Sequence, residues 1–417
     1  MHAIRAPYAF DGVRFRSHGA TVFVEEGRIV GVEDYGAPVP EGSTVHDHPG
    51  ATLLPGLIDT HTHLVADASA GALESLPSRT DEDLEAVITT ALRAHVLAGE
   101  TTVRDLGDRR YLVVDCRDRA APGAEPEVAK PRVLASGPPV TTVGGHCWFL
   151  GGEVAGPDGV VVGVRERLER RVDVVKVMAS GGMLTVESDP LGVQFGIEDL
   201  RAAVEAAHAG GTPLTAHCHS LRAVENAVAA GVDGIEHCTC LGPNGLATTP
   251  ELADRIAGAG IAVCPTVGVD HVLADSVPDP VPPPTIARLL EDMGGLTLRQ
   301  LFDSRYPHVG MLASHGVNLL AGVDSGISPP KAHGFVHLAV EDLVVRCGMA
   351  LADALAAATS RSADALGLGA VTGRLERGLA ADLLVAGGDV RADLQALGRP
   401  ERVVVQGHNA VSPRLDG

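Results

Sequence analysis

The chain has 417 residues, of which 45% are hydrophobic and 21% charged, and its formal net charge is −20 at pH 7. This composition is typical of a globular protein with a large core, and the length suits one α/β barrel with a smaller appended domain. Because phosphate groups are bound by clustered Lys and Arg, such an acidic chain argues against a nucleic-acid or membrane-surface partner.

Both ends of the chain predict short strands. The β-rich segments near the two ends are 21–24, 29–32, 381–386 and 402–407. The first two flank a polar turn, which is the pattern of a hairpin. Because chain ends often lie close together in compact folds, we expect residues 1–53 plus 367–417 to form one composite β-sandwich domain. Residues 54–366 would then form the second domain.

The first motif lies in residues 54–64, an apolar run that ends in His61-Thr62-His63. In a β-strand, residues two apart point to the same side, so both imidazoles can reach one metal ion. The preceding Pro55-Gly56 predicts a turn at the entry to this strand. Two histidines that merely close a strand explain the pattern equally well, so a metal site requires further ligands later in the chain.

Between these ends, strand and helix patterns alternate. Helices are expected over 81–98, 197–210, 221–230, 248–258 and 285–315. Strands are expected over 101–105, 132–137, 172–177, 212–217, 232–237, 261–265 and 317–324. With the first strand they number eight, and eight alternating units predict a parallel (β/α)8 TIM barrel. The proline-rich residues 266–300 are expected to form a long loop over one mouth of this barrel.

Polar residues stand at the predicted strand ends, where such barrels carry their chemistry. They are His61, His63, Lys176, His217, His237 and Asp324. Four imidazoles and a carboxylate predict a centre for a divalent metal such as zinc. Each residue also has a structural interpretation: His237 as a buried core histidine, for example, or Asp324 as a turn former. His219 matches the spacing of a ligand as well as His217 does.

Lys176 discriminates between these interpretations. It lies in an otherwise apolar strand, where an unpaired ammonium group would be costly to bury. A protonated lysine cannot bind a cation, but carboxylation by CO2 would give a carbamate whose two oxygens can bridge two metals. The alternative is a lysine at a strand end that reaches solvent.

No apolar segment suggests a secretory signal or a membrane span, so we expect a cytoplasmic protein. Three of the seven cysteines, Cys218, Cys238 and Cys240, lie next to candidate ligand histidines. We interpret them as reduced packing residues. A cysteine zinc site is the rival, but Cys238-x-Cys240 lacks a partner pair at the usual spacing.

Together these residues resemble the amidohydrolase superfamily, in particular the imidazolonepropionase-like branch with its Xaa-Pro dipeptidases, carboxypeptidases and ochratoxin-type amidases. The resemblance covers essentially the whole chain and rests on the segments 55–63, 175–177, 215–219, 234–237 and 321–324. It implies one metal on His61, His63 and Asp324, a second on His217 and His237, and carboxylated Lys176 between them. The ions would be two divalent metals, with Zn2+ expected.

The resemblance also implies roles around the metals. Asp324 would move the proton, while His146, in the loop after residues 132–137, and His219 would face the substrate. Arg222 is a candidate for binding a terminal carboxylate, although a surface arginine on a helix is the simpler interpretation. Trp148 would suit an apolar substrate group, and core packing explains it equally well.

The expected function is a binuclear metal-dependent hydrolase that cleaves an amide bond of a small substrate through a metal-bridging hydroxide. The alternatives are a cyclic amide or lactone hydrolase, or an imidazolonepropionase- or deaminase-type enzyme with one metal. A non-enzymic scaffold of the same fold is a further alternative, but such proteins typically lose ligands. None of the four tyrosines lies in the loop directly after the strand expected over 212–217, which argues against a plain dipeptidase. The exact substrate and assembly into a homo-oligomer stay open.

Overall fold

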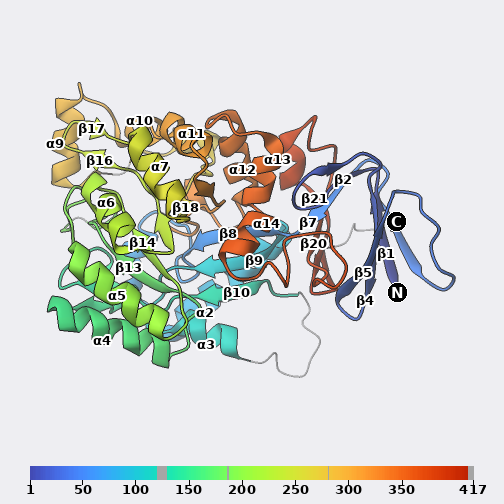
Figure 1. The fold of residues 1–417 in the computed structure, drawn as a ribbon, viewed down its shortest axis with the longest axis horizontal. Helices are drawn as coiled ribbons and strands as arrows, with labels where there is room; N and C mark the ends of the chain where they lie inside the picture. The colour runs from blue at the N-terminus through green and yellow to red at the C-terminus, as the bar shows by residue number, and fades with distance from the viewer. Residues whose placement is uncertain (120–128, 186, 280, 412–417) are drawn as a thin grey trace.

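The computed structural model describes residues 1–119, 129–185, 187–279 and 281–411. Figure 1 shows two groups of elements. Strands from both ends of the chain lie side by side on the right of the view, and strands surrounded by helices fill the left.

The first group consists of two sheets, with strand orders β5-β4-β1-β6 and β22-β21-β20-β7-β2-β3. The strands are β1 His2–Ala6, β2 Tyr8–Phe10, β3 Phe15–Arg16, β4 Ala20–Glu25, β5 Arg28–Glu33, β6 Thr44–Asp47, β7 Thr52–Pro55, β20 Leu383–Ala386, β21 Pro400–Val405 and β22 His408–Val411. The predicted hairpin is confirmed as the antiparallel pair β4 and β5. Apolar side chains of both sheets, such as Val22 and Leu383, share one core cluster.

The motif that begins at Leu54 is divided between two sheets. β7 pairs with β20 and β2, whereas β8 (Leu57–Thr62) pairs with β9 of the central group. Gly56 lies between them, and a Cβ on this residue would collide with the side chain of Thr101. The terminal sheet therefore extends two residues past the expected boundary at residue 53, and a glycine permits the direct change of sheet.

The central group has eight parallel strands in two hydrogen-bonded series, β10-β9-β8 and β13-β14-β15-β18-β19. The strands after β8 are β9 Glu100–Asp105, β10 Arg132–Ala135, β13 Val175–Met178, β14 Leu214–His217, β15 Gly234–Glu236, β18 Ala262–Cys264 and β19 Asn318–Leu319. Ser325, after β19, pairs in parallel with Thr62 of β8. The amide of Asp173, before β13, donates to the carbonyl of Ala135 at 2.9 Å. These links join both ends of the series.

Helices lie outside these strands (Figure 1). They are α2 Asp81–Leu97, α3 Leu112–Asp118, α4 Gly156–Glu169, α5 Ile197–Ala209, α6 Leu221–Ala230, α7 Pro250–Gly258, α11 Tyr306–Ser314, α12 Val336–Val345, α13 Leu351–Ala357 and α14 Ser360–Ala365. The remaining short elements are α1 Ala72–Ser75, β11 Thr141–Thr142, β12 Glu153–Val154, β16 Leu241–Gly242 and β17 Gly245–Leu246, with 3-10 turns at Leu76–Ser78, Trp148–Leu150, Pro329–Lys331 and Leu394–Gly398. The prediction for α2 is confirmed, because Thr80 and Asp83 form a capping box at its start.

The expected loop over residues 266–300 is wrong, because this stretch contains α8 (His271–Ser276), α9 (Pro284–Asp292) and the first half of α10 (Leu298–Asp303). Pro284 is the first residue of α9, where a missing N–H group costs nothing. The expected helical region over 285–315 consists of three helices, α9, α10 and α11, and Gly294 and Gly295 separate the first two. Apolar residues of α9 and α10 form a separate cluster with Met183 and Leu241; the helical members are Ile286, Leu289, Leu290, Leu298 and Leu301.

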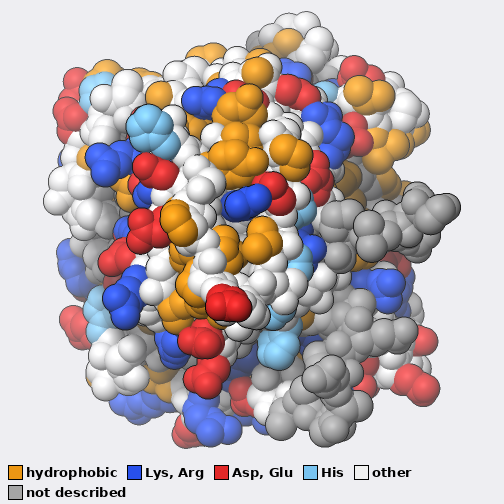
Figure 2. Space-filling view, turned by 90° about the vertical axis from the view of Figure 1, so that its right-hand side faces the viewer, with side chains coloured by type: hydrophobic (Ala, Val, Ile, Leu, Met, Phe, Trp, Pro, Cys, Tyr) orange, Lys and Arg blue, Asp and Glu red, His pale blue; other side chains and the backbone are white. Residues whose placement is uncertain are grey.

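The face of the molecule drawn in Figure 2 carries acidic and basic side chains in a mixed arrangement, with hydrophobic side chains between them. Among the described helices, none combines the length and the apolar character that crossing a bilayer requires.

A buried hydrogen-bond chain holds the segment after β19 against α2 and β9. The Nε2 of His333 donates to the carbonyl of Ala66 at 2.8 Å, so its Nδ1 accepts from the Nε2 of His95 at 3.1 Å. The Nδ1 of His95 then accepts from the Glu100 carboxyl group, which must hold a proton. Burial raises the pKa of Glu100 to about 8 and lowers the pKa of His95 to about 4, in agreement with this assignment.

This proton predicts a pH dependence of stability. In the folded protein, His95 and Glu100 together hold one proton up to about pH 8. In the unfolded chain the same two residues have lost it above pH 6.5, the ordinary pKa of histidine. The free energy of unfolding should therefore fall as the pH rises through this window, by up to about 1.4 kcal/mol per pH unit. Glu100→Gln keeps the hydrogen bonds but removes the proton, so this fall should become smaller, and the remainder comes from Asp59 and Asp108, whose pKa values burial raises to about 7. Urea denaturation at several pH values measures it.

The matched control is Glu82→Gln on the exposed face of α2, which should retain the slope of the unmodified protein. A Glu100→Gln variant that loses stability from pH 6.5 to 8 as steeply as the unmodified protein would contradict the protonated Glu100.

Candidate metal centre

The six residues predicted as metal ligands lie together in the structure. His61 is in β8 and His63 follows it, Lys176 is in β13, and His217 ends β14. His237 directly follows β15, and Asp324 lies beyond β19. All of these side chains are buried except that of Asp324, which is 13% exposed. Parallel strands bring their carboxyl ends to the same edge, so residues far apart in sequence meet there.

One group of donors consists of His61, His63 and Asp324. The Oδ1 of Asp324 is 3.3 Å from Nε2 of His61 and 3.1 Å from Nε2 of His63. Burial opposes ionisation of Asp324, but the charge of His61 and the hydrogen bond and charge of His63 outweigh it, and its pKa is well below the ordinary range. Asp324 is therefore a carboxylate at neutral pH, as a metal ligand must be.

A second group consists of His217, His219 and His237. The ring centroids of His217 and His237 are 4.5 Å apart, and those of His61 and His237 are 5.1 Å apart, so the two groups are neighbours. Burial is the main reason why the pKa values of all three histidines are well below the ordinary value. Neutral imidazoles keep the lone pair that a metal ion requires.

Hydrogen bonds indicate which nitrogen of each ring is free. The Nε2 of His217 donates to the carbonyl of Gly181 at 3.2 Å, so its Nδ1 keeps the lone pair. In His237, Nδ1 is 2.9 Å from the Thr266 hydroxyl and Nε2 is free. The Nδ1 of His219 is likewise 2.9 Å from the hydroxyl of Thr239. Such partners fix the orientation of metal-binding rings.

Lys176 is 2% exposed, and among the described residues its Nζ has no hydrogen-bond or ion-pair partner. Burial lowers the pKa of its ammonium group, and the negative charges of Glu236 and Asp324 oppose the shift only in part. The interpretation of Lys176 as a lysine that reaches solvent is therefore wrong. A lowered pKa favours the neutral amine, which is the form that reacts with CO2.

Glu236 and Arg104 are functional residues that the sequence analysis missed. The Nδ1 of His61 donates to Oε2 of Glu236 at 2.8 Å, which leaves Nε2 of His61 directed at Asp324. Arg104 holds the other oxygen of Glu236 at 2.9 Å, and the hydroxyl of Thr215 also donates to it. The available signal was an Arg and a Glu within two strands expected to be buried, since such charges are rarely buried unless paired.

Asp59 was also missed, and it holds two ligand-bearing segments together. Its Oδ1 accepts from the amides of His61 and Val323, and its Oδ2 accepts from the hydroxyl of Ser325 at 2.6 Å. The residue between Val323 and Ser325 is Asp324, whose φ is 67°. This left-handed backbone is costly for a residue with a side chain, so the surrounding bonds must hold it.

His146 lies beside the second group, with its ring centroid 4.6 Å from that of His217. Its Nδ1 is 2.9 Å from the hydroxyl of Thr185, which also accepts from the amide of Cys147. The hydroxyl proton is therefore available for Nδ1, and Nε2 of His146 carries the other hydrogen. The ring lies against the backbone of Gly182, where a Cβ would collide with it.

The structure brings neither Arg222 nor Trp148 into this cluster. The side chain of Arg222 on α6 is 73% exposed and pairs with Glu225 at 3.5 Å. Trp148 is 41% exposed, and its ring packs against that of Phe149. The interpretation of Arg222 as a surface arginine therefore fits the structure, whereas core packing does not account for Trp148.

The cysteines near the histidines do not form a site of their own. Cys218, Cys238 and Cys240 are buried in the main hydrophobic core, and all seven cysteines of the chain are free. Cys264 lies near His61 and Glu236, but Glu236 is already held by several donors. The packing interpretation fits these contacts.

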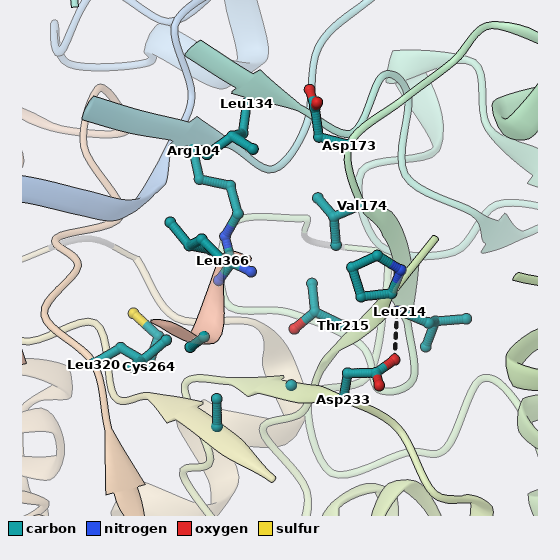
Figure 3. A pocket seen from close by; sticks show the side chains of 14 residues that line it. Arg104, Leu134, Asp173, Val174, Leu214, Thr215, Asp233, Cys264, Leu320 and Leu366 are labelled. Carbon is teal, nitrogen blue, oxygen red and sulfur yellow. Dashed lines mark hydrogen bonds between the residues drawn. The ribbon is translucent and has the colours of Figure 1, made fainter. Parts of the chain in front are cut away.

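Figure 3 shows a cavity at the opposite ends of the strands. It is lined by residues at the starts of strands, such as Leu214 and Gly234, and by Arg104. Its volume of about 30 Å³ suits a water molecule rather than a substrate.

Comparison with known proteins relates the chain to hydrolytic enzymes. It is 25% identical over 392 residues to ochratoxinase from Aspergillus niger, an alignment that covers 87% of this chain and 75% of that protein. It is 26% identical over 369 residues to imidazolonepropionase from Chromobacterium violaceum, covering 82% and 78% of the two chains. A crystal structure of a Xaa-Pro dipeptidase with bound methionine has a TM-score of 0.83, 25% identity, and coverage of 98% and 99%.

The model of the amidohydrolase family matches residues 52–410. The chain belongs to this family and is a hydrolytic enzyme, as the sequence motifs predicted. Members of the family generally use metal ions, and the two donor groups described above fit that requirement.

Gly182 allows a test of the position of His146. Gly182→Ala should displace the imidazole and lower kcat/KM by about 100-fold, the typical effect of losing one donor to a developing oxyanion. Gly258→Ala is the control, because a Cβ there meets nothing within 4 Å, and its activity should stay within about twofold. Steady-state kinetics measures both variants. Equal activity of the two would show that the ring position does not matter.

Proposed function

We propose that residues 54–366 form a (β/α)8 barrel with a binuclear metal centre, joined to a β-sandwich built from residues 1–53 and 367–417. The proposed reaction is hydrolysis of an amide C–N bond in a small substrate. The observation that carries this proposal is the unpartnered Nζ of buried Lys176 beside two adjacent groups of metal donors. A group with no partner in the protein requires one from outside it.

In this proposal His61, His63 and Asp324 hold one ion, and His217 and His237 hold the other. Lys176, once carboxylated by CO2, would supply a further anionic oxygen donor beside both groups. Zn2+ suits the set of imidazole and carboxylate donors. His219 lies close enough to His217 and His237 to join the second group. Its alternative task is to face the substrate.

When bound, two divalent ions acidify a water molecule and polarise the substrate carbonyl. Asp324 is ionised and close to both groups, so it can accept the proton of the attacking water and pass it to the leaving nitrogen. His146 and His219 have pKa values lowered mainly by burial, His146 to about 3. They are therefore neutral and suited to donate N–H groups to the developing oxyanion.

The names of the relatives support an amide substrate, since ochratoxinase and a Xaa-Pro dipeptidase are among them. The similarity to imidazolonepropionase favours a second candidate, a hydrolase of a cyclic amide with one metal ion. The metal content separates the two, because the first requires about two ions per chain and the second about one. The seven free cysteines and the acidic composition support a cytoplasmic enzyme with a small-molecule substrate.

Chelation should abolish hydrolysis of N-acyl amino acids, dipeptides or lactones, and added Zn2+ should restore it.

Asp324→Asn should lower kcat by about 10²- to 10⁴-fold, the usual contribution of a proton-transfer group. Metal analysis of the same sample separates loss of the proton carrier from loss of metal. Near-full turnover of the metal-loaded variant would exclude Asp324 as the proton carrier.

Lys176→Ala should inactivate the enzyme, and a short carboxylic acid such as propionate should restore part of the activity by occupying the place of the carbamate. Lys130→Ala, on the exposed surface, is the matched control and should be fully active without the acid. Full activity of Lys176→Ala without any acid would refute the bridging role. A mass increase of about 44 Da in the unmodified protein, measured under CO2 by native mass spectrometry, provides a separate readout.

A further inference from the structure

Arg104 reaches from β9 to two other strands of the central group. Its Nε donates to the carbonyl of Thr60 in β8 at 2.7 Å, and its Nη2 donates to Oε1 of Glu236 in β15 at 2.9 Å. The residue is buried, with 7% of its surface exposed. Because a guanidinium group stays charged when it is buried, it requires an anionic partner of this kind.

Both contacts of Arg104 converge on His61. Thr60 directly precedes His61 in β8, and the second oxygen of Glu236 accepts from Nδ1 of His61 at 2.8 Å. Arg104 therefore holds the backbone before this histidine and, through the carboxylate, its ring. A carboxylate behind a metal-binding imidazole keeps the hydrogen on the far nitrogen and raises the basicity of the coordinating one.

The other proposed ligand histidines have neutral partners. The Nδ1 of His63 is 3.3 Å from the carbonyl of Gly107, and Nε2 of His217 donates to a backbone carbonyl. The ring of His237 is held by the hydroxyl of Thr266 at 2.9 Å. The two groups of donors therefore differ, because a charged pair supports a ligand of the first and neutral bonds support those of the second.

Thr215 is a second donor to the same carboxylate. Its hydroxyl donates to Oε1 of Glu236 at 2.7 Å, beside Arg104. Arg104 and Thr215 also line the cavity of about 30 Å³ at the opposite ends of the strands, as Figure 3 shows. Since a polar cavity of this size accepts water, a shorter side chain at position 104 leaves space that solvent can fill. We therefore expect the fold to tolerate Arg104→Gln.

We propose that Arg104 is a positioning residue for one of the two metal ions. By holding Glu236, it presents Nε2 of His61 to the ion of the first group. Loss of this support should weaken that ion and leave the ion of the second group largely unaffected. The inference rests on the proposed function, because it concerns the same binuclear centre. The first group is His61, His63 and Asp324, and the second contains His217 and His237.

Zinc binding to the chelated protein tests this assignment, measured by titration in competition with a chromogenic chelator. Arg104→Gln should weaken one of the two ions by about 10- to 100-fold, the usual effect of removing a partner behind a metal ligand. Arg104→Lys keeps a charged donor to Glu236 and should restore part of the affinity. Thermal denaturation checks that both variants are folded.

Thr215→Val removes the second donor and keeps the shape of the side chain, so it should weaken the same ion by a smaller factor. The matched control is Thr102→Val in β9, since the hydroxyl of Thr102 is buried and no described residue forms a hydrogen bond with it. This control should bind zinc as the unmodified protein does. Equal zinc affinities of Arg104→Gln, Thr215→Val and Thr102→Val would overturn the proposal.

A double variant tests whether Arg104 acts through Glu236. Glu236→Gln should itself weaken the ion, and the further change Arg104→Gln should then add much less than it does alone, because residues that act together are not additive. The same factor for Arg104→Gln in both backgrounds would contradict an action through Glu236.

Two other backgrounds identify the ion that is lost. His237→Asn removes a ligand of the second group, and His63→Asn removes one of the first. Arg104→Gln should weaken the remaining ion in the His237→Asn background and leave the remaining ion of His63→Asn unchanged. The opposite pattern would refute the assignment to the first group.

A measurement without metal separates this inference from the proposed function. In chelated protein with isotope-labelled histidine, nuclear magnetic resonance reports which ring nitrogen carries the hydrogen. His61, identified by His61→Asn, should carry it on Nδ1 in the unmodified protein and partly on Nε2 in Arg104→Gln. An unchanged His61 overturns the positioning role. If the unmodified protein binds only one zinc ion, the binuclear function fails, whereas a hydrogen that moves in His61 would still support the role of Arg104.

Discussion

The exclusion of water from a dense group of titratable side chains is the constraint on which the rest of this structure depends. Four imidazoles, an amine and a carboxylate lie at one edge of the strands, nearly all of them buried. Burial lowers the pKa values of His61, His217, His237 and Lys176, whereas for His63 the effect of burial is outweighed by the hydrogen bond and charge of Asp324, which raise its pKa. The cluster therefore offers lone pairs rather than positive charges, which is the state that binds a cation.

The neighbouring residues hold this cluster in place with bonds that leave its coordinating atoms free. Glu236, fixed by Arg104, takes the Nδ1 of His61, and the carbonyl of Gly181 takes the Nε2 of His217. These bonds fix one nitrogen of His61 and one of His217, so the other nitrogen of each of these two rings is oriented before any ligand arrives. Such preorganisation reduces the reorganisation that binding and catalysis would otherwise require.

Much of this arrangement could be predicted from the sequence, because strand ends are recognisable from local patterns. The helix that begins after Thr80 and the histidines at 61, 63, 217 and 237 were found in this way. The pattern placed Asp324 at the end of a strand, but the strand itself ends at Leu319 and Asp324 adopts a left-handed backbone. Tertiary bonds from Asp59 hold that conformation, and no local pattern encodes them.

Other features were hidden because they depend on contacts between distant segments. Prolines near residue 284 suggested a loop, yet Pro284 starts a helix whose apolar face packs with Met183 and Leu241. Arg222 stood near a motif in sequence, but its side chain points to solvent.

The single glycine between β7 and β8 connects a strand of the terminal sheet directly to the strand that carries the first metal-ligand candidates. β7 is hydrogen-bonded on one side to β2, near the start of the chain, and on the other to β20, near its end. His61 lies in β8 and His63 follows it, and β8 comes directly after β7 and Gly56. The pairing of β7 with β20 involves residues as late in the chain as Ala386. Removal of either end of the chain would therefore take away one neighbour of β7 and weaken the support of the strand that leads to these two ligands.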